Sequence, residues 1–297
     1  MSESSITTKM VPVHLSKKNE EFTIIAAGDF HVGANAFNER AFKVFIKQIK
    51  KESIHRQVFI LFMGDLFDSI SPADRRFNAG ERNTNMHKSQ EKFKELIAPI
   101  LNNPRITFVG SLIGNHELMY SRGDTDPIAL IHQTTGIDHL GIKSYIYFDL
   151  KYKKKKIATL RTVAFHGAKN SATDYGRLKI IKDFLKENNL THDEFLRMND
   201  IVFYGHTHDC RVEKSPHLLV KPRSKEQGYR NQYGCLTGSF YDTANFTSKS
   251  YASNRGFEPL MVGYIKARVG FTLGINPEAI TGNGLNPNVQ ELKWTDM

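Results

Sequence analysis

Short apolar runs alternate with amphipathic stretches along most of the chain. An apolar run that ends at a glycine or a polar residue is typical of a buried strand. Such runs predict strands at residues 22–28, 57–64, 106–114 and 200–204. Apolar residues at helical spacing predict helices at residues 36–51, 86–101 and 173–188. Strands that alternate with helices indicate an α/β fold.

The second half of the chain is richer in strand patterns. Residues 145–150 and 156–165 flank the lysine-rich stretch "KYKKKK", which predicts a hairpin. Further apolar runs follow residue 209. We therefore expect an N-terminal segment at residues 1–20, one domain at residues 21–274 and a loosely packed tail, rich in Asn, Gly and Pro, at residues 275–297.

The composition is that of an ordinary globular protein, with 40% hydrophobic and 24% charged residues in a chain of 297. No apolar run is long enough to cross a membrane, so we expect no membrane association. The N-terminal stretch lacks the basic and apolar regions of a secretory signal. The two cysteines, Cys210 and Cys235, fit a reducing compartment, so we expect a cytoplasmic protein. No pattern indicates an oligomeric state.

Residue types that bind metals follow directly after the predicted strands. The motifs are "GDFH", "GDLFD", "GNHE", "FHG" and "GHTH", which supply Asp29, His31, Asp65, Asp68, Asn115, His116, Glu117, His166, His206 and His208. In open α/β sheets, ligands bind beyond the carboxyl ends of the strands, so loops distant in sequence can meet there. The ordered series is a much stronger signal than any one motif.

The two histidines of "GHTH" leave two local conformations open. Both side chains could share a face if the strand continued, or both could lie on a loop at its tip. Carboxylates and imidazoles gathered in one place would lose hydration at a cost of several kcal/mol. Divalent cations would remove that cost. A ligand set of His, Asp and Asn without thiolate suits Mn, Fe, Zn or Mg.

The five motifs, in this order, resemble the calcineurin-like metallophosphoesterase family. The resemblance implies a four-layer α/β/β/α sandwich of two mixed β-sheets flanked by helices. It also implies two divalent metal ions, for which we expect Mn²⁺ first, with Fe, Zn or Mg as alternatives. By position, the implied metal ligands are Asp29, His31 and His208 for the first ion, Asp65 as the bridge, and Asn115, His166 and His206 for the second.

The resemblance implies a mechanism as well. A hydroxide bridging the ions would attack phosphorus, and His116 would protonate the leaving group. Either Glu117 or Asp68 could orient His116. For His166, a packed core histidine is the alternative. Asp68 stands where the purple acid phosphatase branch has a tyrosine, which argues against that branch.

The motifs do not select a substrate, but the net charge of +10 attracts polyanions, nucleic acid above all. We expect the substrate-binding residues to be Arg75, Arg76 and Arg82 in the insert at residues 69–85, and Tyr229 and Arg230 in the basic stretch at residues 221–233. A solvated loop is the alternative for each. "KYKKKK" is more simply a solvated hairpin. Tyr241 and Asp242 could line the site, although core packing is the favoured interpretation.

We therefore expect a nucleic-acid phosphodiesterase, that is, a nuclease. The alternatives are a phosphomonoesterase or small-nucleotide phosphodiesterase, and last a non-catalytic scaffold, because scaffolds usually lose metal ligands and here none is missing. The chain is also similar to nuclease subunits of double-strand-break repair complexes. Only residues 209–297 follow His208, so we expect no DNA-capping domain and leave an ATPase partner in doubt.

Overall fold

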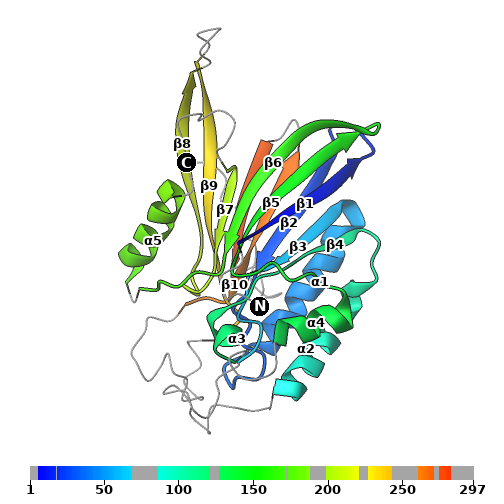
Figure 1. Ribbon diagram of the computed structural model, residues 1–297, viewed down its shortest axis with the longest axis vertical. Coiled ribbons are helices and arrows are strands. Elements are labelled where there is room, and N and C mark those ends of the chain that lie inside the picture. Colours follow the sequence, from blue (N-terminus) through cyan, green and yellow to red (C-terminus); the bar gives the residue numbers. More distant parts are fainter. Residues whose placement is uncertain are drawn as a thin grey trace.

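Two mixed β-sheets lie face to face in the described part of the chain, with helices on both outer surfaces (Figure 1). The computed structural model describes residues 6–17, 19–68, 86–120, 127–171, 173–187, 199–220, 227–242, 260–270 and 274–281. The arrangement confirms the expected α/β sandwich.

The described strands of the first sheet number five, in the order β11-β10-β2-β3-β4. Their bounds are β2 Glu21–Ala27, β3 Gln57–Phe62, β4 Ile106–Ser111, β10 Gly263–Gly270 and β11 Gly274–Thr281. β2, β3 and β4 run parallel, whereas β10 pairs antiparallel with both β2 and β11. The three parallel strands therefore end at the same edge.

The second sheet has six described strands, in the order β1-β5-β6-β7-β9-β8. Their bounds are β1 Ile6–Leu15, β5 Lys143–Tyr152, β6 Lys155–Phe165, β7 Ile201–Tyr204, β8 Cys210–Val220 and β9 Gln227–Thr237. β5 and β6 form the predicted hairpin. Lys153 and Lys154 at its turn both have positive φ, as a type I′ turn requires.

Helices α1 (Glu39–His55), α2 (Met86–Leu101) and α4 (Pro127–Thr135) lie on the side of the five-stranded sheet, and α5 (Asp174–Glu187) lies on the opposite side of the sandwich (Figure 1). The short helix α3 (Asn115–Tyr120) follows β4. No helix in the described ranges is both long and apolar enough to span a membrane.

The apolar core of the described residues has three layers. One lies between α1, α2 and the five-stranded sheet, one between the sheets, and one between α5 and the six-stranded sheet. Neighbours in a strand point to opposite layers: Ile24 packs between the sheets, whereas Ile25 packs against the helices. The central strands are buried on both faces, which explains why they are continuous apolar runs.

The sheets extend past the predicted domain at both ends. Residues 6–15, assigned to the N-terminal segment, form β1, which pairs parallel with β5 and buries Val11, Val13 and Leu15 in its alternating pattern. Residues 274–281, mostly assigned to the tail, form β11. α3 and α4 were not predicted either, because each is short. The insert at residues 69–85 lies outside the described residues.

Candidate metal centre

The motif residues all follow the carboxyl ends of strands. Asp29 follows β2, Asp65 follows β3, and Asn115 opens α3 after β4. In the other sheet, β6 and β7 run parallel and are followed by His166 and by the pair His206 and His208. The loops at one edge of each sheet therefore bring these side chains close together.

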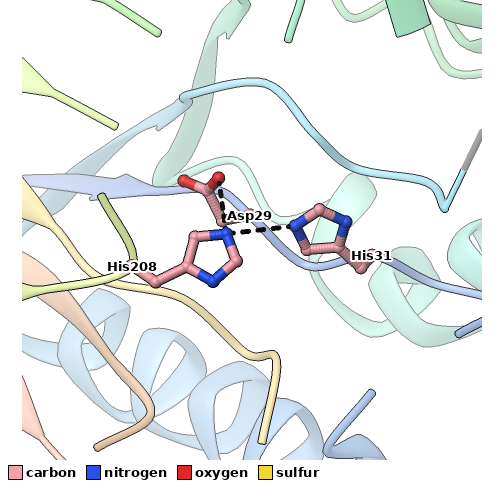
Figure 2. A group of neighbouring side chains, drawn as sticks. All are labelled: Asp29, His31 and His208. Carbon is pink, nitrogen blue, oxygen red and sulfur yellow. Dashed lines mark hydrogen bonds and ion pairs between the residues drawn. The ribbon is translucent and has the colours of Figure 1, made fainter. Parts of the chain in front are cut away.

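The first group contains Asp29, His31 and His208, whose side chains point toward one another (Figure 2). The Nε2 atoms of His31 and His208 are 3.3 Å apart, and His208 Nε2 lies 3.4 Å from Asp29 Oδ1. The ligand atoms all lie within 4.8 Å of one another. These three residues could hold one cation, and they are the set expected for the first ion.

Asp65 lies between this group and a second one. It belongs to a cluster with His31 and His116 and to another with His166 and His206. Asp65 Oδ2 is 3.3 Å from His166 Nε2, so His166 belongs to the site and is not only a packed core residue. Asp65 could therefore contribute a ligand to a cation at either cluster.

Asn115 completes the second group. Its Oδ1 lies 3.1 Å from His166 Nε2, and the rings of His166 and His206 are 5.4 Å apart. The amide oxygen, two imidazoles and the Asp65 carboxylate could hold a second cation.

Most of these residues have an unusual backbone conformation. Positive φ occurs at Asp29 (49°), His31 (50°), Asp65 (49°), His206 (62°) and His208 (57°). Among the described non-glycine residues, only the hairpin turn shares this feature. The left-handed region costs an L-residue roughly 1–2 kcal/mol. β7 ends at Tyr204, so the two histidines of "GHTH" lie on a loop at its tip.

Hydrogen bonds to Asp29 stabilise that conformation. Its amide donates to the carbonyl of Gly64 over 2.9 Å, and its own carbonyl accepts from Ser239 Oγ at 2.8 Å and from the amide of Phe240 at 3.1 Å. Its Oδ2 accepts from the amide of His206 at 3.0 Å. Asp29 therefore ties together the loops after β2, β3, β7 and β9.

Glu117 is buried and holds the neighbouring loop. Its carboxylate accepts hydrogen bonds from the amides of Asp65 at 2.9 Å, Phe67 at 3.1 Å and Gly114 at 2.9 Å. Burial, together with the charge of Asp65, raises the pKa of Glu117 to about 7. Glu117 thus contacts backbone amides and positions Asp65, which differs from the expected role of orienting His116.

His116 faces the metal residues. Its backbone amide donates to Asp65 Oδ1 over 2.9 Å, and its ring lies 4.7 Å from that of His31. Its Nδ1 lies 3.5 Å from Asp68 Oδ1. Of the two carboxylates considered, Asp68 is therefore the one placed to orient His116.

The pKa values of the histidines at the candidate metal centre are shifted in opposite directions. Burial would lower the pKa of His166, but the Asp65 carboxylate outweighs it and raises that pKa to about 10. Burial and the neighbouring imidazoles lower the pKa of His31, and burial with the charge of His166 lowers that of His206 to about 4. At neutral pH the imidazoles of His31 and His206 are therefore neutral, and each has a nitrogen lone pair that can bind a cation.

The donor set fits divalent cations. Asp29 Oδ1 and His31 Nδ1 are buried and have no hydrogen-bond partner in the described part of the chain. Unpaired buried polar atoms cost free energy, and a bound cation would satisfy the carboxylate oxygen. Oxygen and imidazole ligands without thiolate suit Mn, Fe, Zn or Mg.

Tyr241, for which core packing was the favoured interpretation, lies beside the first group of metal residues. Its ring lies 5.2 Å from that of His31 and 5.9 Å from that of His208, and it is half-buried. No motif marks it. The hydrogen bonds from Ser239 and Phe240 to Asp29 bring it there, and these contacts cannot be read from a local pattern.

Of the expected substrate-binding residues, only Tyr229 and Arg230 lie in the described part of the chain. Arg75, Arg76 and Arg82 lie outside the described residues. The backbone of Tyr229 and Arg230 lies in β9, about 25 Å along the strand from its site end at Thr237. Their role in substrate binding stays a prediction. The lysine-rich turn lies at the other end of β6 from His166, which agrees with a solvated hairpin.

The model of a family described as calcineurin-like phosphoesterase matches residues 22–210, more than half of the chain. No curated protein matches. Among solved structures, the chain is similar to "GAP50 the anchor in the inner membrane complex of Plasmodium", with 10% identity and a TM-score of 0.41, over 88% of this chain and 84% of that one.

Proposed function

The chain belongs to the calcineurin-like phosphoesterase family, and from this premise we propose that it is a nuclease that hydrolyses nucleic-acid phosphodiesters. That it is a metal-dependent phosphoesterase follows from the family together with the clustered ligands. The single observation that carries the proposal is the position of Asp65, whose carboxylate lies within 4.8 Å of the ligand atoms of His31 in the first group and of His166 and His206 in the second.

The residues of the candidate metal centre would have separate roles in the reaction. Two bound divalent cations would supply Lewis acidity and make water reactive near neutral pH. Asp29 and Asp65 supply the negative charge that retains cations. His116, whose Nδ1 lies 3.5 Å from Asp68 Oδ1, would donate a proton to the leaving oxygen. The hydrogen bonds of Asp29 and Glu117 hold this geometry before substrate arrives.

Nucleic acid as the substrate is supported by charge. The chain has 41 Lys and Arg against 31 Asp and Glu, and a net positive field attracts a phosphate backbone. Manganese is the ion we propose first, because mixed carboxylate, amide and imidazole ligands suit it.

The test uses metal-free protein reconstituted with Mn²⁺. Labelled single-stranded and double-stranded DNA and RNA are assayed beside para-nitrophenyl phosphate and bis-para-nitrophenyl phosphate. We expect cleavage of nucleic acid and of the diester, and loss of both in Asp65→Asn. The matched control is Asp149→Asn, which changes a carboxylate on β5 that pairs with Lys156, outside the site.

The outcomes separate the alternatives. Hydrolysis of the monoester with no cleavage of nucleic acid would overturn the nuclease proposal in favour of a phosphatase. Hydrolysis of neither class by the reconstituted protein would favour a scaffold that has kept the fold.

A further inference from the structure

A cavity of about 320 Å³ lies between α5 and the ends of β6 and β7. Three aromatic residues line it: Phe165 at the end of β6, Tyr204 at the end of β7 and Phe184 on α5. Lys169 and Lys179 line it as well. Its volume falls in the range of small-ligand sites, roughly 300–1,000 Å³, and apolar walls with a few polar groups are typical of such sites.

The aromatic wall is rigid. The rings of Phe165 and Phe184 are stacked at 5.6 Å, and Tyr204 meets them edge-on at 5.6 Å and 5.1 Å. Phe184 and Tyr204 are buried, whereas Phe165 is half-buried. Of the three rings, the half-buried Phe165 is therefore the one that can stack on a nucleobase, a contact with little dependence on sequence.

The charge at the cavity suits a phosphodiester. Lys169 and Lys179 are exposed at its edge, and Asp183 is the one carboxylate among the lining residues. Asp183 forms an ion pair with Lys179 at 2.6 Å. The lining therefore carries a net positive charge next to an apolar interior.

The cavity adjoins the second group of metal residues. Phe165 directly precedes His166, and the loop after His166 is bound to Tyr204: the amides of Ala168 and Lys169 donate to the Tyr204 hydroxyl over 3.3 Å and 3.1 Å. The three residues from His166 to Lys169 span at most about 10 Å. The same loop also contacts His206 of the second group, because Asn170 Nδ2 donates to the His206 carbonyl over 3.3 Å.

Gly167 permits this close contact. Its φ is 99°, and a β-carbon there would lie 2.5 Å from the ring of Tyr204. Any other residue would push the loop away from the aromatic wall, and with it both His166 and the cavity edge.

We propose that this cavity binds the nucleobase of the nucleotide next to the scissile phosphate. The inference rests on the proposed nucleic-acid function, and it specifies how a strand is positioned at the centre. The base stacks on Phe165, and Lys169 and Lys179 contact the backbone phosphates. The subsite selects nucleotides over phosphodiesters that lack a base.

The test fills the cavity. Ala168 is exposed and lines the cavity, and Ala168→Trp keeps the amide that donates to Tyr204. The matched control is Ala98→Trp, at an exposed position on α2. Binding by Mn²⁺-loaded protein is measured with a nucleoside phosphonate, which lacks a hydrolysable ester, and with the same phosphonate lacking the base.

We expect the wild type and Ala98→Trp to bind the nucleoside phosphonate about tenfold more tightly than the base-free compound, because stacking of the base adds to the binding free energy. Ala168→Trp should lose that preference and bind the base-free compound as the wild type does. Equal binding of the nucleoside compound by Ala168→Trp and wild type would overturn the inference, as would a wild type with no preference for the base.

DNA cleavage is measured separately on the same proteins. Cleavage by the wild type together with unchanged base preference in Ala168→Trp would refute the subsite and leave the nuclease proposal intact. A base preference that depends on Ala168, without DNA cleavage, would support the subsite and refute the nuclease proposal.

Discussion

Positive φ at Asp29, Asp65 and His208 is the feature that most clearly separates this site from ordinary polar loops. Each such residue costs roughly 1–2 kcal/mol, so other contacts must compensate. The compensating contacts are the backbone hydrogen bonds around Asp29 and the carboxylate of Glu117. The strained conformations aim the ligand atoms at shared positions, so the site is organised before an ion binds.

The placement of His116 predicts a dependence on the leaving group. His116→Ala should lower kcat by about 10²–10⁴ for an alkyl phosphodiester, whose leaving oxygen needs a proton. The loss should be much smaller for bis-para-nitrophenyl phosphate, whose leaving group departs without one. Steady-state kinetics on both substrates checks this. Equal losses on both would instead indicate that His116 acts through metal binding.

The three amide hydrogen bonds of Glu117 predict a structural defect in Glu117→Gln. In the variant, an NH₂ group replaces one carboxylate oxygen. At least one of the three backbone N–H groups that donate to Glu117 in the wild type therefore loses its acceptor. The free energy of unfolding should fall by about 1–3 kcal/mol, as measured by urea denaturation of the metal-free protein. Asp68→Asn serves as the comparison, and a fall of the same size there would argue against this special role of Glu117.

At the scale of elements, side chains on α1 anchor the helix to the five-stranded sheet. Glu52 on α1 accepts a hydrogen bond from Thr23 Oγ1 of β2 at 2.8 Å and pairs with Arg56 at 2.5 Å. Phe42, Phe45 and Ile49 bury the apolar face of the same helix. The contact keeps β2 in place, and β2 leads directly into Asp29.

This contact predicts a pH dependence of stability. Burial would raise the pKa of Glu52, but the hydrogen bonds from Arg56 and Thr23 outweigh it and lower that pKa below its ordinary value of 4.5. Because the folded-state pKa is lowered, the stabilisation is present above the unfolded-state pKa and is lost as the pH falls through the folded-state value.

Glu52→Gln should therefore lower the free energy of unfolding at pH 7 by about 1–2 kcal/mol. The difference from wild type should shrink as the pH falls below 4.5 and the carboxylate becomes protonated. Urea denaturation at several pH values measures both. A difference that stays constant down to acid pH would show that the charge of Glu52 does not contribute.

At the scale of the whole molecule, the candidate metal centre joins the two sheets. Asp29 and Asp65 come from the five-stranded sheet, and His166, His206 and His208 come from the six-stranded one. Separation of the sheets would break the group of Asp29, His31 and His208 and the group of Asp65, His166 and His206. Folding and metal binding are therefore coupled.

The coupling predicts that Mn²⁺ raises the thermal midpoint. At a free concentration of about 100 times Kd, binding adds about 2.7 kcal/mol to the free energy of unfolding. For a chain of 297 residues that corresponds to a shift in Tm of roughly 4 °C. Calorimetry with and without Mn²⁺ measures it. Asp65→Asn should lose most of the shift, whereas Asp149→Asn should keep it, and an equal shift in both variants would contradict the coupling.

Much of this architecture could be predicted from sequence because the signals are local. Continuous apolar runs identify strands buried on both faces, and the order of "GDFH" through "GHTH" identified the residues that converge. β1 was missed because it buries only one face, so its apolar run is interrupted. β11 was missed because its sequence GINPEAIT contains Gly, Asn and Pro, which are typical of loops.

The sequence by itself determined which residues meet, since strand ends at one sheet edge must bring their loops together. Only the tertiary structure decided how they meet. The left-handed backbone at Asp29, the amide contacts of Glu117, the position of Tyr241 and the cavity beside His166 all depend on contacts between residues far apart in the chain. Such contacts leave no local pattern, because each residue involved is compatible with several surroundings and only packing selects one.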